Sequence, residues 1–88
     1  MKIIVSPLAE KGLRKLSKVN QIVVAKRIRA LATSGPRAND EQLKGYKNIL
    51  RTRIGDIRIV YKKTKTIFYI ILVGQRKDIY EKLKRLLT

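Results

Sequence analysis

The sequence contains no cysteine and no histidine. Without cysteine, neither a disulfide framework nor a thiolate metal site can form. Without histidine, the chain lacks the side chain that serves most often as a general base and as a metal ligand near neutral pH. We therefore predict that the protein uses no metal and no other cofactor, and that any catalysis depends on other proton-carrying groups.

Long apolar runs are also absent. No stretch approaches the roughly 20 apolar residues of a transmembrane helix. The apolar run from Ile3 to Val5 is too short for a signal peptide, and Pro7 follows it at once. These features predict a cytoplasmic protein without membrane contact. A chain of 88 residues has the length of one domain, so we expect residues 1–88 to form a single one.

Acidic residues are scarce. The chain has 22 Lys and Arg against 6 Asp and Glu, which gives a formal net charge of +16. Such a charge opposes compaction and attracts polyanions. Lysine spread over solvated surfaces would account for it without any ligand. A nucleic acid, or an acidic protein that neutralises the charge, is the explanation we favour.

In the N-terminal half, the pattern predicts a strand and two helices. The run from Ile3 to Val5 is typical of a short strand. Ser6 and Pro7 suit the N-cap and the first position of a helix. A second helix is expected from about Asn20, as its N-cap, to Thr33, where a glycine and a proline follow.

In the C-terminal half, the pattern changes to strands. Residues 50–54 and 57–61 flank the dipeptide Gly55-Asp56, which is typical of a two-residue hairpin turn. The nearly continuous apolar run 67–73 predicts a third strand buried in the sheet, and Tyr69 is expected to be buried with it.

A short helix, which Asp78 can cap, is expected to follow the third strand of the C-terminal half. The predicted order of elements is β-α-α-β-β-β-α. Two N-terminal helices packed on a twisted antiparallel sheet, with a short C-terminal helix, make an α+β fold.

A two-residue turn fixes the register of the predicted hairpin, and this register gathers arginines. Arg53 falls opposite Arg58, and Arg51 falls on the same face because side chains alternate along a strand. Tyr61 falls on the other face, which is expected to pack on the helices. Like charges opposite each other destabilise a sheet, and such conflicts are expected at functional sites. The alternative is an exposed sheet face that happens to be basic.

Two further residues are expected near the arginine face. The third strand ends at Gly74, at the same end of the sheet as the hairpin turn, so Arg76 can approach Arg58. Tyr80 lies about one helical turn beyond Arg76. Several guanidinium groups on an open face suit a phosphate, but arginine stays charged and cannot move a proton. Tyr80 is therefore the candidate proton carrier, and packing of its ring against apolar residues is the alternative.

Three motifs follow one another in the C-terminal half: Leu43-Lys44-Gly45, Arg51-x-Arg53-Ile54-Gly55-Asp56-x-Arg58-Ile59-Val60-Tyr61 and Val73-Gly74-Gln75-Arg76-x-x-Ile79-Tyr80. In this order and spacing they resemble the RelE/ParE toxin superfamily of type II toxin–antitoxin systems. The resemblance covers residues 43–80 well and the helix after Ser6 more loosely. It implies a RelE-like fold, in agreement with the elements above.

The superfamily contains two activities. RelE-like members enter the ribosomal A site and cut messenger RNA through attack of a ribose 2′-hydroxyl on its own phosphodiester, which inhibits translation. ParE-like members poison DNA gyrase and are not nucleases. The combination of arginines with a tyrosine favours the first activity, a messenger-cutting endoribonuclease. A gyrase poison and a degenerate homologue that only binds nucleic acid are the alternatives.

The resemblance implies catalytic roles for Arg51, Arg58, Arg76 and Tyr80. This chain has Ile49 at a position where the founding RelE-like type of the superfamily has a second lysine. It has Gln75 at a position where many relatives have histidine. These departures fit a mechanism built on arginine and tyrosine. A second group is expected to contact RNA, with Tyr46 as a stacking platform: Arg53, Lys44, Lys47, Tyr46, Lys11, Lys15 and Lys26.

The resemblance also implies an antitoxin encoded beside the chain. We expect an acidic, RelB-like and partly disordered protein that folds on binding and forms a hetero-oligomer with this chain. It is expected to cover the arginine face or to displace the helix that bears Tyr80. The other expected partners are the ribosome, messenger RNA and ribosomal RNA. Operator DNA is expected to be bound only through the antitoxin.

Overall fold

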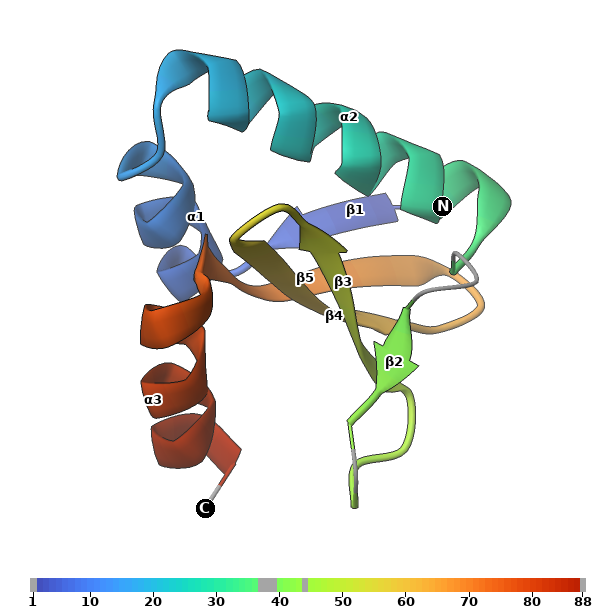
Figure 1. Ribbon diagram of the computed structural model, residues 1–88. Coiled ribbons are helices and arrows are strands. Elements are labelled where there is room, and N and C mark those ends of the chain that lie inside the picture. Colours follow the sequence, from blue (N-terminus) through green and yellow to red (C-terminus); the bar gives the residue numbers. More distant parts are fainter. Residues whose placement is uncertain (1, 37–39, 44, 88) are drawn as a thin grey trace.

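The computed structural model of the chain describes residues 2–36, 40–43 and 45–87. Figure 1 shows its helices and strands. In chain order they are β1 (Lys2–Val5), α1 (Pro7–Arg14), α2 (Lys18–Ser34), β2 (Glu41–Gln42), β3 (Ile49–Ile54), β4 (Ile57–Lys63), β5 (Ile67–Gln75) and α3 (Arg76–Leu87). Within these residues, no helix combines the length and the apolar character that crossing a bilayer requires.

Serine residues cap the first two helices. Ser6 caps α1 as predicted, because its side chain accepts a hydrogen bond from the backbone N–H of Ala9, and Pro7 stands at the first helical position. The predicted start of the second helix at Asn20 is wrong. Ser17 caps α2 and accepts from the N–H of Asn20. Serine and asparagine are comparable N-caps, and the earlier of the two gives the longer helix.

The five strands form one sheet in the order β1-β5-β4-β3-β2. The strands β3, β4 and β5 form the predicted antiparallel meander, and the α+β class is confirmed. The sheet is mixed rather than wholly antiparallel, because β1 runs parallel to β5. The short edge strand β2, which the sequence pattern does not predict, pairs with β3 and places Glu41 opposite Arg51.

Helices pack on both faces of the sheet. On one face, α1 and α2 form the larger buried cluster, in which Val24 packs with Ile59 and Tyr61. On the other face, α3 forms a smaller cluster around Val60. Figure 1 shows α2 above the sheet and α3 at its left end. Because Arg58 alternates with the residues of the larger cluster along β4, it faces the α3 side.

Tyr61 is buried in the larger cluster, as predicted. Its hydroxyl donates a hydrogen bond to Asp40 Oδ2 at 2.7 Å. Burial raises the pKa of the Tyr61 phenol well above its usual range, and the hydrogen bond to Asp40 and the charge of that carboxylate raise it further. This bond ties the chain just before β2 to the centre of the sheet.

Replacing Tyr61 with phenylalanine is expected to flatten the fall of stability at alkaline pH. In the wild type, the folded phenol keeps its proton above about pH 10, where the unfolded phenol loses it. The free energy of unfolding therefore keeps its full value below about pH 10. Above about pH 10 it falls by up to about 1.4 kcal/mol per pH unit. Tyr61→Phe removes this slope and costs about 1 kcal/mol near neutral pH through the lost hydrogen bond. Urea unfolding over this pH range measures both effects, and an unchanged alkaline slope would contradict the prediction.

Candidate active site

The β3–β4 hairpin has the predicted register. Arg53 pairs with Arg58 across the two strands, and Ile54 pairs with Ile57 around the turn. Gly55 has a φ of 58°, as the first central residue of a type II′ hairpin turn requires. The hairpin therefore places two cationic side chains directly opposite each other.

Arg58 is buried, with 5% of its surface exposed. Its Nη1 donates to the carbonyl oxygens of Gly55 at 2.8 Å and Ile57 at 3.3 Å. Its Nε is buried and has no partner among the described residues. Burial lowers the pKa of this guanidinium, and the charges of Arg53 and Arg76 lower it further. A buried cation among like charges, with a donor left over, is stabilised by a bound anion.

Arg51 joins three elements at the site. From β3, its Nη1 donates to the hydroxyl oxygen of Tyr80 on α3 at 2.8 Å. Its Nη2 forms an ion pair with Glu41 Oε2 on β2, also at 2.8 Å. The Cζ atom of Arg51 lies 5.5 Å from the centroid of the Tyr80 ring. The Arg51 side chain is 14% exposed, and its Nε is also buried without a partner within the described part of the chain.

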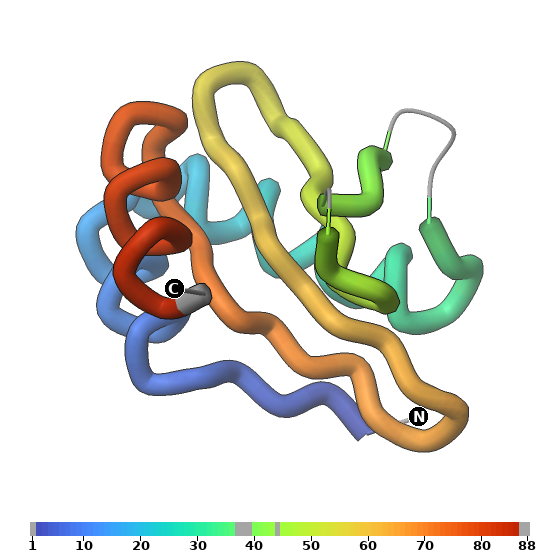
Figure 2. The backbone as a smooth tube through the Cα atoms, turned by 90° about the horizontal axis from the view of Figure 1, so that it is seen from below, coloured from blue at the N-terminus to red at the C-terminus, as the bar shows by residue number. Residues whose placement is uncertain are grey.

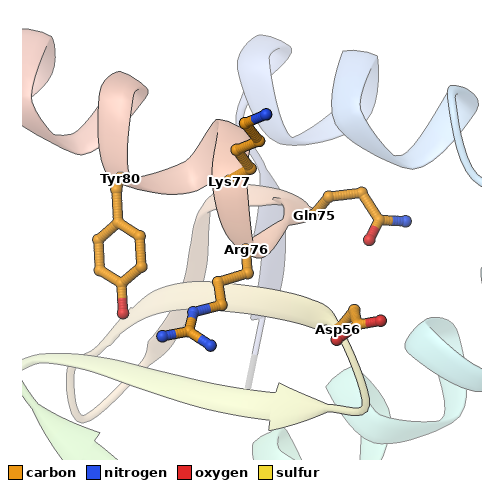
Figure 3. Close-up of a pocket in the computed structure, with 5 residues that line it drawn as sticks. All are labelled: Asp56, Gln75, Arg76, Lys77 and Tyr80. Atoms are coloured by element: carbon orange, nitrogen blue, oxygen red, sulfur yellow. The ribbon is translucent and has the colours of Figure 1, made fainter.

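Helix α3 carries Arg76 and Tyr80 to the arginine face. The helix begins at Arg76, two residues before the predicted cap Asp78, and the N–H of Arg76 donates to the carbonyl oxygen of Asp56 at 2.9 Å. In Figure 3 the side chains of Arg76 and Tyr80 point from the helix toward the strands, whereas Lys77 points the other way. Tyr80 is 47% exposed, so packing in the core does not explain its position.

An open cavity of about 490 Å³ lies beside these residues. Its lining, drawn in Figure 3, consists of Asp56, Gln75, Arg76, Lys77 and Tyr80. Tyr80 belongs both to this lining and to the contact with Arg51, so the cavity adjoins the arginine cluster. Its volume lies in the range of small-molecule sites, about 300–1,000 Å³.

The arrangement can both bind a phosphate and supply a proton. The charges of Arg51, Arg53 and Arg76 all act on Arg58, so four guanidinium groups share one small region. Guanidinium forks match phosphate oxygens and form short, charge-assisted hydrogen bonds with them. The hydroxyl of Tyr80 accepts the bond from Arg51 and so keeps its own proton for donation.

Apart from Arg53, the described residues that were predicted to bind RNA lie in the loop between β2 and β3 and in the layer of α1 and α2. In the loop between β2 and β3, Lys47 is exposed and Tyr46 is half-buried, while Lys44 lies outside the described residues. Three exposed lysines belong to the layer of α1 and α2, on the opposite face of the sheet: Lys11, Lys15 and Lys26. The structure therefore groups the arginines with Tyr80, whereas Lys11, Lys15 and Lys26 lie on the other side of the sheet.

Two residues near the site were not predicted from the sequence. Glu41 holds Arg51 by an ion pair. Arg27 on α2 donates from Nη1 to Thr52 Oγ1 at 3.0 Å and to the carbonyl oxygen of Arg53 at 3.4 Å, which supports the hairpin from its other face. The sequence could have pointed to Glu41, because it is one of only 6 acidic residues in a strongly basic chain and an ion pair with an arginine is therefore expected of it. No local pattern marks Arg27, because its partners lie 25 and 26 residues away along the chain.

The sequence matches a known protein family over most of its length. Residues 3–80 match the family described as the ParE toxin of type II toxin–antitoxin systems, parDE. No curated protein shows a significant match to the sequence. The matched region runs from β1 to Tyr80 and so contains the whole arginine cluster.

The fold is similar to solved structures of toxins. A chain of the RelB–RelE antitoxin–toxin complex from Methanococcus jannaschii superposes with a TM-score of 0.74 at 21% identity, over 90% of this chain and 96% of that one. The isolated RelE toxin of E. coli gives 0.73 at 19% identity, over 99% and 98%. The YoeB dimer from Staphylococcus aureus gives 0.72 at 17% identity, over 84% and 94%. These likenesses establish a RelE-like fold.

Proposed function

The chain belongs to the ParE toxin family of type II toxin–antitoxin systems, and from the chemistry of its arginine site we propose that it is a ribosome-dependent endoribonuclease. Its fold is RelE-like. In this proposal, residues 1–88 act in the cytoplasm as one toxin domain. The domain enters the ribosomal A site and cuts messenger RNA there, which stops translation.

The observation that carries the proposal is the hydrogen bond from Arg51 to the Tyr80 hydroxyl. A site that only bound a phosphate would need the guanidinium groups alone. Here a phenol is held by a cation at the edge of the cluster around Arg58. A positioned proton carrier beside fixed cationic donors is the combination that cleavage of a phosphodiester requires.

The proposed reaction forms a bond between the ribose 2′-oxygen and the adjacent phosphorus and breaks the bond from that phosphorus to the 5′-oxygen. Arg58 and Arg76 bind the nonbridging oxygens and stabilise the charge that develops. The proton of the 2′-hydroxyl passes to the carboxylate of Glu41, and Tyr80 protonates the leaving 5′-oxygen. Arg51 stabilises the phenolate that remains. The products are a 2′,3′-cyclic phosphate and a 5′-hydroxyl.

Ribosomal RNA is bound in this proposal by Arg53 of the cluster and by cations outside the cluster. Backbone phosphates attract exposed lysines and arginines, give salt-dependent affinity and select little sequence. The residues proposed for these contacts, with Tyr46 stacking on a base, are Lys11, Lys15, Lys26, Lys47, Arg53 and Tyr46.

The proposed antitoxin is an acidic, RelB-like chain. Two of the structurally similar proteins are complexes named for RelB together with RelE, and a charge of +16 favours an acidic partner. The antitoxin covers the arginine face or displaces α3 from Arg51, and operator DNA is bound only through it. A complex that leaves Arg58 and Arg76 open to substrate, with Tyr80 undisturbed, would count against this arrangement.

A gyrase poison is the second candidate function. The matching family is named for ParE, and the superfamily resemblance includes gyrase poisons. In this case the arginine cluster would contact gyrase or its DNA, and no bond would be broken by the toxin. The Tyr80 hydroxyl would then have no role in the reaction.

Primer extension on a messenger in a translating extract tests the nuclease. The wild type is expected to produce cuts that require ribosomes and end in a cyclic phosphate. Tyr80→Phe removes only the hydroxyl and is expected to slow the cutting about a hundredfold or more. A supercoiling assay with gyrase accompanies the experiment. Absence of cuts together with inhibited supercoiling would reject the nuclease in favour of the gyrase poison.

A further inference from the structure

The part of the sheet that α3 does not cover carries an exposed aromatic side chain. Tyr69 on β5 is 36% exposed, so the prediction that it is buried is wrong. Its neighbours Phe68 and Ile70 are fully buried in the larger cluster under α1 and α2. Because side chains alternate along a strand, Tyr69 projects from the opposite face of the sheet.

Cross-strand pairing places three other residues in a row with Tyr69. Tyr69 pairs with Ile4 on β1 and with Lys62 on β4, and Lys62 pairs in turn with Ile49 on β3. Paired residues project to the same face with Cβ atoms about 5 Å apart. We call these four residues the open row. Arg51 is two residues along β3 from Ile49 and shares its face, so the open row adjoins the candidate active site.

On this face, the cluster under α3 extends from the β3–β4 turn to the middle of β4 and β5 and reaches Ile49 at one end of the open row. Its buried residues Ile79 and Leu83 form the smaller cluster with Val60 and Leu72. Figure 2 views the molecule from below, and there α3 lies at one end of the sheet. No described helix lies in front of β4 and β5 near the turn that joins them. Lys62 and Tyr69 are therefore exposed on the side that carries the arginines, while Ile4 and Ile49 are half-buried.

The strands that carry the open row are mostly basic, although Glu41 on β2 lies beside them in an ion pair with Arg51. No acidic residue occurs in residues 57–77 or in residues 2–5. Residues 57–77 contain six basic ones: Arg58, Lys62, Lys63, Lys65, Arg76 and Lys77. Within the described chain, neither Lys62 nor Tyr69 has a side-chain hydrogen bond or ion pair. A cation and an aromatic ring are thus both available to a polyanion.

We propose that the open row is a track for single-stranded RNA that extends from the arginine site, with one base stacked on Tyr69 and a backbone phosphate bound by Lys62. The proposal rests on the proposed function for the identity of the strand. A ring next to a cation is the combination with which proteins hold single-stranded nucleic acid with little sequence selection. An acidic peptide would be attracted by Lys62 but would gain little from the exposed ring.

The spacing fits one continuous strand of RNA. From Arg51 to Tyr69 the path runs two residues along β3 and two strands across the sheet. At about 3.3 Å per residue and 4.8 Å per strand, this gives about 12 Å between the two Cα atoms. At about 3.4 Å per stacked nucleotide, the same distance holds three or four nucleotides. A messenger bound at the arginine site would therefore reach Tyr69 about one codon away.

Binding of RNA without ribosomes tests the track. The probe is a fluorescent oligonucleotide of about 12 nucleotides with 2′-O-methyl groups throughout, which prevents 2′-oxygen attack, and anisotropy reports its affinity. Tyr69→Ala is expected to weaken binding about tenfold, and Tyr69→Phe, which keeps the ring, to bind like the wild type. Lys62→Gln is expected to reduce the slope of log affinity against log salt by about 1.

The control for lost charge is Lys18→Gln, which removes one exposed lysine from α2 on the opposite face of the sheet. It is expected to weaken binding less than Lys62→Gln does. Equal effects of Tyr69→Ala and Tyr69→Phe on RNA binding would overturn the proposal. So would a finding that Tyr69→Ala weakens binding of a polyglutamate peptide as much as it weakens binding of the RNA probe. Thermal unfolding shows whether each variant is folded, and Lys62→Gln tests the row independently of Tyr69.

The binding assay separates the track from the proposed nuclease. A wild type that binds RNA with these variant effects but never cuts a messenger would support the track and reject the nuclease. A wild type that cuts messengers, with RNA affinity insensitive to Tyr69→Ala and Lys62→Gln, would reject the track alone.

Discussion

Replacing Arg58 with alanine is expected to lower the rate of ribosome-dependent messenger cleavage by about a hundredfold or more. Arg58 is 5% exposed, and its Nε is buried without a partner among the described residues. A donor that is fixed before the reaction, in a place with little water, stabilises developing charge at no cost in reorganisation. Loss of one such donor typically costs about 3–4 kcal/mol of transition-state stabilisation. Single-turnover cleavage on programmed ribosomes measures the rate of the chemical step.

Two further variants make the Arg58 result specific. Arg58→Lys keeps the charge but loses the guanidinium fork, so it is expected to restore little of the rate. Lys18→Gln removes one charge on the opposite face of the sheet and is expected to cleave within about twofold of the wild type, since exposed phosphate-binding charges act on affinity. A rate for Arg58→Ala within about tenfold of the wild type would mean that the buried guanidinium does not stabilise the transition state.

The hairpin could be predicted from the sequence because its geometry is local. Gly55 takes the positive φ of a two-residue turn, and such a turn fixes the register of the strands on either side. The opposition of Arg53 and Arg58 and the burial of Tyr61 follow from that register and are both observed. The position of Arg76 followed in the same way, because the third strand of an antiparallel meander ends at the same end as the turn between the first two.

The pairing of β1 and β2 depends on contacts that no local pattern contains. Lys2 pairs with Ile67, far along the chain, and the two strands run parallel. Strand β2 has only two residues, too few for an alternation that could be recognised. Its consequence, the ion pair between Glu41 and Arg51, was therefore not predicted either.

The exposure of Tyr69 shows the same limit for side chains. A continuous apolar run predicts burial on both faces only if both faces are covered along their whole length. Helix α3 packs on β5 through Leu72, but no described helix covers the strand near the β4–β5 turn. How far a helix extends over a sheet is set by tertiary packing, so the open row could be found only in the structure.

Replacing Gly12 with alanine is expected to destabilise the fold by about 2 kcal/mol or more. Gly12 is buried in α1, and a Cβ atom there would overlap the carbonyl oxygen of Val73 and lie 2.9 Å from its carbonyl carbon. Because the obstacle is backbone rather than a flexible side chain, α1 or β5 must move. Overpacking of this kind typically costs about 1–3 kcal/mol and occasionally more, and overlap with backbone places this site at or above the upper end of that range. Alanine regains about 1 kcal/mol of helix propensity, which leaves a net cost of about 2 kcal/mol or more. Thermal unfolding should show a loss of about 10 °C in Tm.

The same substitution is expected to impair the candidate active site. Val73 is followed by Gly74 and by Gln75, the last residue of β5, after which α3 begins at Arg76. A shift of β5 away from α1 therefore moves the start of α3 and with it the contact between Arg51 and Tyr80. Lys11→Ala, the neighbouring exposed position of α1, is the control and should change the unfolding free energy by less than about 0.5 kcal/mol. If Gly12→Ala were as stable as the wild type, the close approach of α1 to β5 would not exist in solution.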